Sequence, residues 1–240
     1  MNDRVYSETE VLALARQAYR TGRATFEVVA ERCALILIDM QDEFIKPGWT
    51  PYWVPAATRM VPRVATLIAR CREVGVPVIY TAFAATHHRL DRPRSGTCMP
   101  NRYPGDGEND EWFRDGRIWH ELAPHGDDLV IFKPSYGAFY DTPLETILRN
   151  LDRDTIIIAG TLTNFCCGTT ARQGYERGFN VVFGSDITAT DDPDLQDAEL
   201  SVLRKGFARV MTASEIASSL RTPGNDAQSI GHAGCAQDPH

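Results

Sequence analysis

Short, nearly continuous apolar runs alternate along the chain with longer segments in which apolar residues recur at helical spacing. Such runs predict strands of a parallel sheet, which are buried on both faces and need apolar side chains at successive positions. The predicted strands are residues 33–39, 76–83, 128–132, 154–160, 180–184 and 208–212. The predicted helices are residues 55–74, 142–151, 166–177, 194–206 and 213–220. This alternation indicates a single-domain, three-layer α/β/α fold with a central, mostly parallel sheet of about six strands.

The pattern changes towards both ends of the chain. Residues 8–21 predict an amphipathic helix outside the core, so we expect an N-terminal helical extension over 1–32 and the main domain over 33–221. Residues 222–240 are polar and rich in Gly and Pro, which predicts a flexible C-terminal tail. Residues 84–127 form the longest irregular segment, which favours an ordered flap beside a pocket over a plain surface excursion.

The amino-acid composition limits the classes of partner and cofactor that we expect this protein to bind. The 240 residues carry a net charge of −7, which argues against nucleic acid or an anionic membrane as a partner. No apolar run approaches the length of a membrane span, and the N-terminus lacks the signal-peptide pattern, so a cytoplasmic location is expected. The six cysteines show neither a CxxC pair nor the spacing of a disulfide framework, so reduced thiols are expected. The nearest approach to a metal cluster, His87–His88, does not show zinc-ligand spacing, so no metal or other cofactor is expected.

Three candidate chemical groups follow predicted strands, at the sheet edge where open α/β folds bind ligands. Asp39 ends the first strand, Lys133 follows the third, and Cys166 and Cys167 stand in the turn "GTLTNFCC" after the fourth. A thiol must ionise to attack a carbonyl, and an ammonium or a helix N-terminus stabilises its thiolate. A carboxylate can take the thiol proton and later return it to a leaving amine. Taken singly, each group has a structural explanation, so the interpretation depends on their joint occurrence.

The chain resembles the isochorismatase-like cysteine hydrolases, a family of nicotinamidases, N-carbamoylsarcosine amidohydrolases, ureidoacrylate amidohydrolases and biuret hydrolases. The motifs that carry the resemblance are "LILIDMQDEF", "KPSYGAFYDTPLETILRN", "IIIAGTLTNFCCGTTARQGYERGF" and "VVFGSDITAT". They follow the family's order and spacing over about residues 33–220. Most members of this family self-associate, so the resemblance implies a homo-oligomer, either a dimer or a tetramer.

The resemblance also implies roles for individual residues. Asp39 matches the family's catalytic acid, Lys133 its catalytic lysine and Cys166 its nucleophile, which leaves Cys167 as a packed neighbour. The family's non-proline cis peptide falls between Thr161 and Leu162. The amides of Leu162 and Cys166 would then form the oxyanion hole. For the small-molecule substrate, Trp53, Phe139 and Trp112 are candidates for an apolar wall, and Arg89 for an anion-binding group; Arg92, Arg94 and Arg172 are alternatives to Arg89.

Two departures from the family pattern bear on the substrate. Several relatives carry a charged residue two places after the nucleophile, where this chain has Gly168. Metal-dependent nicotinamidases have an Asp-x-His unit after the second strand, where this chain reads "YTAFAATHH". The motifs therefore favour an amidohydrolase that cleaves a C–N bond of a small linear ureide or primary amide and releases ammonia. The alternatives are a nicotinamide-, maleamate- or biuret-type amidase, an isochorismate-type vinyl-ether hydrolase, and a catalytically silent binding protein.

Overall fold

The computed structural model describes residues 4–22, 24–93 and 112–220. Its centre is one six-stranded sheet in the order β3-β2-β1-β4-β5-β6, and every neighbouring pair of strands is parallel. The strands are β1 (Cys33–Ile38), β2 (Val78–Phe83), β3 (Leu129–Lys133), β4 (Thr155–Thr161), β5 (Asn180–Ala189) and β6 (Arg209–Met211). The predicted parallel α/β/α fold is confirmed.

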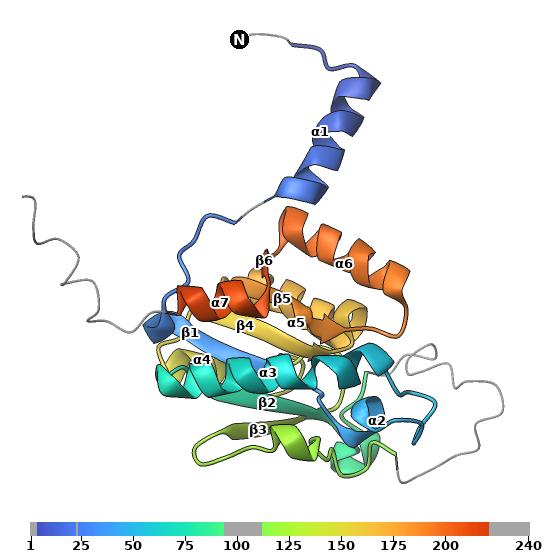
Figure 1. Ribbon diagram of the computed structural model, residues 1–240, viewed down its shortest axis with the longest axis vertical. Coiled ribbons are helices and arrows are strands. Elements are labelled where there is room, and N and C mark those ends of the chain that lie inside the picture. Colours follow the sequence, from blue (N-terminus) through green and yellow to red (C-terminus); the bar gives the residue numbers. More distant parts are fainter. Residues whose placement is uncertain (1–3, 23, 94–111, 221–240) are drawn as a thin grey trace, which may run out of the picture.

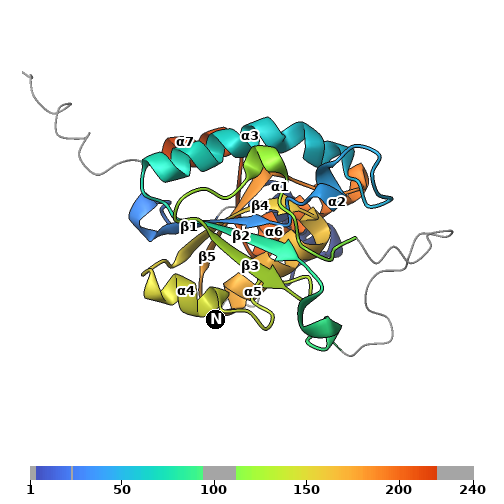
Figure 2. The ribbon, with the colours of Figure 1, turned by 90° about the horizontal axis from the view of Figure 1, so that it is seen from below.

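Helices cover both faces of the sheet (Figures 1 and 2). The helices are α1 (Glu8–Thr21), α2 (Asp42–Ile45), α3 (Pro55–Glu73), α4 (Leu144–Asn150), α5 (Gly168–Glu176), α6 (Pro193–Gly206) and α7 (Ala213–Ser219). Helices α3 and α7 pack on one face, and α4, α5 and α6 on the other. The alternation of side chains along β1 supplies both cores: Leu35 and Leu37 point towards α3, whereas Ile36 and Ile38 point towards the opposite layer. All six residues of β1 are buried, as its continuous apolar sequence predicts.

The helix α1 stands apart from both layers. It begins with a capping box between Ser7 and Glu10, and none of its residues is buried. Its C-terminal end approaches α6, and the rest of the helix extends away from the body (Figure 1). No helix among the described residues is both long and apolar enough to cross a membrane. The predicted C-terminal tail, 222–240, lies outside the described residues.

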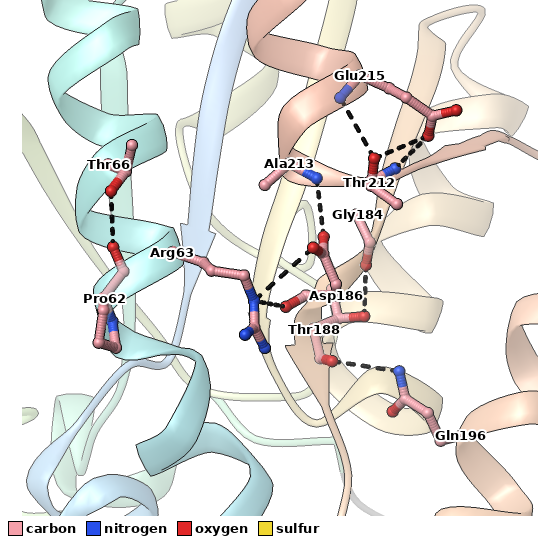
Figure 3. Close-up of polar contacts among 10 residues, drawn as sticks. All are labelled: Pro62, Arg63, Thr66, Gly184, Asp186, Thr188, Gln196, Thr212, Ala213 and Glu215. Atoms are coloured by element: carbon pink, nitrogen blue, oxygen red, sulfur yellow. Dashed lines mark hydrogen bonds and ion pairs between the residues drawn. The ribbon is translucent and has the colours of Figure 1, made fainter.

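Strand β5 is longer than the sequence predicts, since it continues through residues 185–189. Its pairing with β4 shifts register, because Ile158 pairs with Phe183 but Gly160 pairs with Thr188. The additional residues include Asp186, whose carboxylate accepts a hydrogen bond from the Ala213 amide at 2.7 Å and lies near Arg63 of α3 (Figure 3). The polar residues that hid this extension from the apolar pattern therefore tie β5 to α3 and α7.

Two buried thiols give the fold a defined response to alkaline pH. Burial raises the pKa of Cys33 and that of Cys71 to about 12, whereas an unfolded thiol titrates near pH 8.5. Because the folded pKa is the higher one, the contribution to stability is complete below about pH 8.5 and is lost as pH rises towards the folded pKa. Each thiol should lower the free energy of unfolding by about 1.4 kcal/mol per pH unit in that window.

We therefore expect Cys71→Ala to unfold with a shallower pH dependence than the wild type above about pH 8.5. Urea unfolding at several pH values between neutrality and strongly alkaline conditions measures the slope. The matched control is Leu67→Ala, which truncates a buried side chain on the same helix without removing a titrating group. Its loss of stability should be the same at every pH. Equal slopes for the wild type and Cys71→Ala would exclude the proposed linkage.

Candidate active site

Asp39 follows β1 directly and is fully buried. Its backbone has φ of 49°, a left-handed conformation that Asp adopts more readily than most residues. The Thr81 hydroxyl on β2 donates to Asp39 Oδ1 at 2.8 Å, and the Thr161 hydroxyl on β4 donates to the Asp39 carbonyl at 2.8 Å. The two strands that flank β1 thus fix both the backbone and the carboxylate of Asp39.

Lys133 is the last residue of β3, and its side chain is also fully buried. Its Nζ lies 2.7 Å from Asp39 Oδ2, 2.9 Å from the Ser135 carbonyl oxygen and 3.4 Å from Cys166 Sγ. An ammonium has three protons, and three polar atoms surround this one. Lys133 therefore joins the predicted acid and the predicted nucleophile in one buried cluster.

Cys166 lies in a π-helical turn, Thr163–Cys167, which precedes α5. The Cys167 amide donates to the Leu162 carbonyl at 3.1 Å, five residues back, which is the bond that widens the turn. The sequence predicts one helix from residue 166, because hydrophobic periodicity does not separate a π turn from the helix it enters. Cys166 is 6% exposed, whereas Cys167 is completely buried, as the resemblance implies for the packed neighbour. The Thr161–Leu162 peptide bond is cis, also as the resemblance implies.

Electrostatics at the site favour a neutral thiol next to an ion pair. Burial, helped by the Asp39 charge, raises the pKa of Cys166 to about 12, although Lys133 opposes this rise. Burial acts to lower the pKa of Lys133, but the charges of Asp39 and Cys166 outweigh it, and the net shift is upward. We expected the ammonium to stabilise the thiolate; it does, but burial is the larger effect.

Asp39 lies close to both other groups of the cluster. Its Oδ2 forms an ion pair with Lys133 Nζ at 2.7 Å. Asp39 also interacts with the Cys166 thiol, and this interaction adds to the rise in the pKa of Cys166. The Cys166 thiol is therefore the nearest candidate proton donor to the Asp39 carboxylate.

Gln41 is a structural part of the site that the sequence did not indicate. It is fully buried just beyond β1, where its Nε2 donates to the Phe83 carbonyl at 3.0 Å and its Oε1 accepts from the Phe83 amide at 2.8 Å. This side chain thus extends the pairing between β1 and β2 past the end of the strand. It fixes Phe83, whose ring centroid lies 5.4 Å from Lys133 Nζ.

We predict that Gln41→Leu lowers the free energy of unfolding by about 2–5 kcal/mol, because two buried backbone groups lose their partner. Chemical denaturation measures the change. Gln17→Leu, on the exposed α1 helix, is the control and should change stability by less than about 0.5 kcal/mol. Equal stability of Gln41→Leu and the wild type would show that these two hydrogen bonds do not hold the strand ends together.

Gln196 is a second supporting residue that the sequence did not indicate. It holds the π turn that carries Cys166. Gln196 on α6 accepts a hydrogen bond from the Thr163 hydroxyl at 2.7 Å. It also donates to the Thr188 carbonyl at 3.2 Å (Figure 3). It connects the π turn to the extended part of β5. The sequence carried no signal for this role, since the contact depends on the register shift in β5.

Gly168, the departure from the family pattern, lies against Glu199 of α6. A Cβ added at Gly168 would come within 2.2 Å of Glu199 Oε1 and 2.8 Å of the Thr163 carbonyl oxygen. Glu199 is paired with Arg172, whose Nη2 donates to it at 3.1 Å. The Glu199 carboxylate therefore occupies the space that a side chain at 168 would need. Arg172 is held in an ion pair with this carboxylate.

The predicted substrate-binding residues have separate locations. Trp112 lies in the returning part of the predicted flap, residues 112–127. Its ring centroid lies 6.0 Å from that of Tyr52. Trp53 donates through Nε1 to the Thr58 hydroxyl at 2.9 Å. Phe139 is 6% exposed and packs 5.6 Å from Phe179 in the core shared by α4 and α5, which is a structural position. The Arg89 side chain and the whole of Arg94 lie outside the described part of the chain.

The returning part of the flap lies beside Asp39. The Trp119 amide donates to the Met40 carbonyl at 2.8 Å, and Gln41 pairs with Ile118 in an antiparallel bridge. Phe113 contacts Phe83 with ring centroids 5.5 Å apart, and its amide donates to the buried carboxylate of Glu43 at 2.8 Å. Burial raises the pKa of Glu43. The middle of the predicted flap, 94–111, lies outside the described residues.

In the first described part of the predicted flap, residues 84–93, Arg92 and His87 also have defined contacts. The Arg92 guanidinium lies 4.7 Å from the centroid of the Phe83 ring, which also contacts Lys133. His87 Nδ1 lies 2.8 Å from Asp91 Oδ2, so His87 has an acidic neighbour four residues further along the chain. Within 4–22, 24–93 and 112–220, no three His, Cys, Asp or Glu side chains are grouped so that they could hold a metal ion.

Comparison with known proteins shows to which family this chain belongs. The model of the isochorismatase domain matches residues 33–215, three quarters of the chain. The chain belongs to the isochorismatase family. Members of this family are hydrolases, and many are amidases that act on C–N bonds. The matched region contains every strand of the sheet and the Asp39–Lys133–Cys166 cluster.

Individual relatives agree with this assignment. The chain is 32% identical to nicotinamidase 3 of Arabidopsis thaliana over 78% of its own length and 88% of that protein. It is 26% identical to the ureidoacrylate amidohydrolase of Methylobacterium radiotolerans, over 79% of this chain and 80% of the relative. A cysteine hydrolase from Pseudomonas syringae superposes with a TM-score of 0.73 at 30% identity, covering 83% of this isochorismatase-family chain and 97% of the other.

Proposed function

We propose that this isochorismatase-family protein is a cysteine-dependent amidohydrolase, which cleaves a C–N bond of a small linear ureide or primary amide and releases ammonia. The observation that carries the proposal is the Lys133 ammonium, buried 2.7 Å from Asp39 Oδ2 and 3.4 Å from Cys166 Sγ. Burying a cation costs free energy unless oppositely charged and polar partners compensate it. Placed between an acid and a thiol, it stabilises whichever of the two carries the negative charge.

Activation begins with a proton transfer. The Cys166 thiol gives its proton to Asp39 Oδ2, and Lys133 then faces a thiolate and a neutral carboxylic acid. Because the net charge of the cluster does not change, the transfer needs no counterion from solvent. Burial raises the pKa of the Cys166 thiol, so the transfer to Asp39 relies on Lys133 to stabilise the thiolate.

Acylation follows when the thiolate sulfur attacks the substrate carbonyl carbon. The carbonyl oxygen takes the negative charge, and the backbone amides of Leu162 and Cys166 form the proposed oxyanion hole. As the tetrahedral intermediate collapses, the C–N bond breaks and Asp39 donates its proton to the departing nitrogen. Ammonia leaves, and the acyl or carbamoyl group remains on Cys166 as a thioester or thiocarbamate.

Deacylation restores the enzyme. Asp39 takes a proton from water, and the resulting hydroxide attacks the thioester carbonyl. The Cys166–carbonyl bond then breaks, and the thiolate recovers the proton from Asp39. The second product is a carboxylic acid, or a carbamate that decomposes, so each turnover consumes one water and releases one ammonia.

Two features support a substrate that also carries an acidic group. Arg92 and Lys133 both contact the ring of Phe83, which brings a second cation close to the catalytic cluster. The relatives include a nicotinamidase and a ureidoacrylate amidohydrolase, which act on an amide and on an acidic ureide, as their names state. We propose that Arg92 lies where it can bind the carboxylate of such a ureide.

Ammonia release from a panel of compounds tests the proposal. The panel contains ureidoacrylate, N-carbamoyl amino acids, biuret, maleamate and nicotinamide, with isochorismate assayed separately for vinyl-ether cleavage. We expect ammonia from at least one ureide or primary amide, with an acidic ureide as the best substrate. Turnover of isochorismate alone, or of no compound by the folded protein, would overturn the amidohydrolase proposal.

A further inference from the structure

A cavity of about 480 Å³ lies between the end of α1, the end of α6, β6 and α7. It shares no lining residue with the Asp39–Lys133–Cys166 cluster. Its volume is within the range of pockets that hold small organic molecules, and it exceeds what a single inorganic ion needs. Its lining residues are Arg20, Thr21, Gly22, Arg204, Arg209, Val210, Met211, Ser214, Glu215, Ser218 and Ser219.

Three arginines, Arg20, Arg204 and Arg209, line this one cavity. None of the three forms an ion pair with an acid among the described residues. The arginines that do form such pairs are Arg4, Arg32, Arg63, Arg70, Arg72, Arg149, Arg172 and Arg177. In a chain of net charge −7, a cavity with three arginines that lack acidic partners is an unusual concentration of positive charge.

The position of Arg209 is fixed by the fold. It is the first residue of β6, and its Nη1 donates to the Phe26 carbonyl at 2.9 Å. Its Nε is buried and has no acceptor among the described residues. The bond to the Phe26 carbonyl holds the Arg209 side chain in one position at the cavity that this residue lines.

The other polar residues complete an anion site. Ser214 and Ser218 on α7 provide hydroxyl groups, which can donate to a phosphate or carboxylate oxygen, whereas the Ser219 hydroxyl already donates to the Glu215 carbonyl at 2.9 Å. The one acid in the lining, Glu215, is engaged by its own helix cap, because its Oε2 accepts from the Thr212 amide and hydroxyl at 2.7 and 2.9 Å. Its carboxylate keeps its negative charge, so the lining holds three cationic side chains against one anionic side chain.

The cavity depends on parts of the chain outside the family domain. Arg20 belongs to α1, and Ser218 and Ser219 follow residue 215, where the family match ends. The end of α1 fits closely against α6, since a Cβ at Gly22 would come within 2.9 Å of the Arg204 carbonyl oxygen. The N-terminal helix thus contributes one wall of a site that the isochorismatase domain alone would not form.

We propose that this cavity binds a small organic molecule through a multiply charged oxyanion group, either a phosphate ester or clustered carboxylates. Arg209 and Arg204 hold the oxyanion, Arg20 closes it from the α1 side, and these two serine hydroxyls of α7 bind the remaining oxygens. A guanidinium matches phosphate and carboxylate oxygens in geometry as well as charge. The site is separate from the proposed chemistry, and its occupant would stabilise the contact between α1 and the body.

The test is direct binding to the full chain by calorimetry at fixed ionic strength. The probes are ribose 5-phosphate, citrate and inorganic phosphate, with neutral ribose as the control. Arg20→Gln and Arg204→Gln remove cavity charges that make no described contact essential to the fold. The matched control is Arg16→Gln, which removes an exposed charge from the same helix outside the cavity.

We expect ribose 5-phosphate or citrate to bind, with inorganic phosphate weaker and ribose without binding. Each cavity variant should weaken binding by about tenfold or more, whereas Arg16→Gln should leave it unchanged. Preference for ribose 5-phosphate would identify a phosphate ester, and preference for citrate would identify clustered carboxylates. No binding of any anion to the wild type, or equal binding by the wild type and both cavity variants, would overturn the proposal.

Discussion

Ammonia release by Cys166→Ala should fall by about 10⁴-fold or more from the wild-type rate, because the variant has no nucleophile to form the covalent intermediate. The fold should be retained, since the replacement removes one buried sulfur and leaves Asp39 paired with Lys133 at 2.7 Å. The rate is measured with the best substrate of the ammonia assay, and circular dichroism checks the fold.

The matched control for this loss is Cys167→Ala. Cys167 is the adjacent residue, is completely buried and lies in the core on the α4–α6 face of the sheet. Burial raises the pKa of both thiols, but the hydrogen bond from Lys133 Nζ goes to Cys166, so we expect Cys167 to be a packing residue. This variant should lose about 1 kcal/mol of stability and keep its activity within a few-fold. Loss of activity in Cys167→Ala with activity retained in Cys166→Ala would reverse the assignment.

Asp39→Asn should lower both activity and stability, for different reasons. It removes the proposed proton acceptor, which should reduce kcat/KM by about 10²–10⁴-fold. It also leaves the fully buried Lys133 ammonium without its charge partner, and breaking such a pair costs about 3–5 kcal/mol. Lys133→Met should destabilise the fold by a similar amount, because it leaves the Asp39 carboxylate buried and unpaired.

The double variant Asp39→Asn/Lys133→Met separates the two effects. With both charges gone, it should be more stable than either single variant, and it should remain inactive. Urea unfolding of the four proteins gives the coupling free energy, and the ammonia assay gives the activity. Additive losses of stability would show that the two groups are not a coupled buried pair, and turnover by the double variant would exclude them from catalysis.

The fold and the three central residues could be predicted because they depend on simple patterns. Continuous apolar runs mark buried parallel strands, and the residue after each run must lie at the carboxyl edge of the sheet. The positions of Asp39 and Lys133 needed no more information than this, whereas the roles proposed for them came from the family resemblance. Selecting Cys166 over Cys167 required the family resemblance, since both cysteines stand in the same turn and only the π-helical geometry separates their side chains.

The supporting contacts could not be predicted, because they depend on register and on side chains that meet across long sequence separations. Gln41 bonds to the backbone of Phe83, and Gln196 bonds to the Thr188 carbonyl in the part of β5 beyond its register shift. Polar residues in the sequence of β5 concealed that continuation. The sequence also did not indicate that the Phe139 ring packs against Phe179, because that contact joins residues far apart along the chain.

The most direct test of the account is mass spectrometry of the intact protein during turnover. Acid quenching in the steady state, followed by peptide mapping, should show an acyl or carbamoyl adduct on Cys166, with its mass set by the substrate. The adduct should be absent from Cys166→Ala and should be lost when substrate is exhausted. Steady ammonia release without any adduct on Cys166, and with the same rate in Cys166→Ala, would contradict covalent catalysis by this thiol.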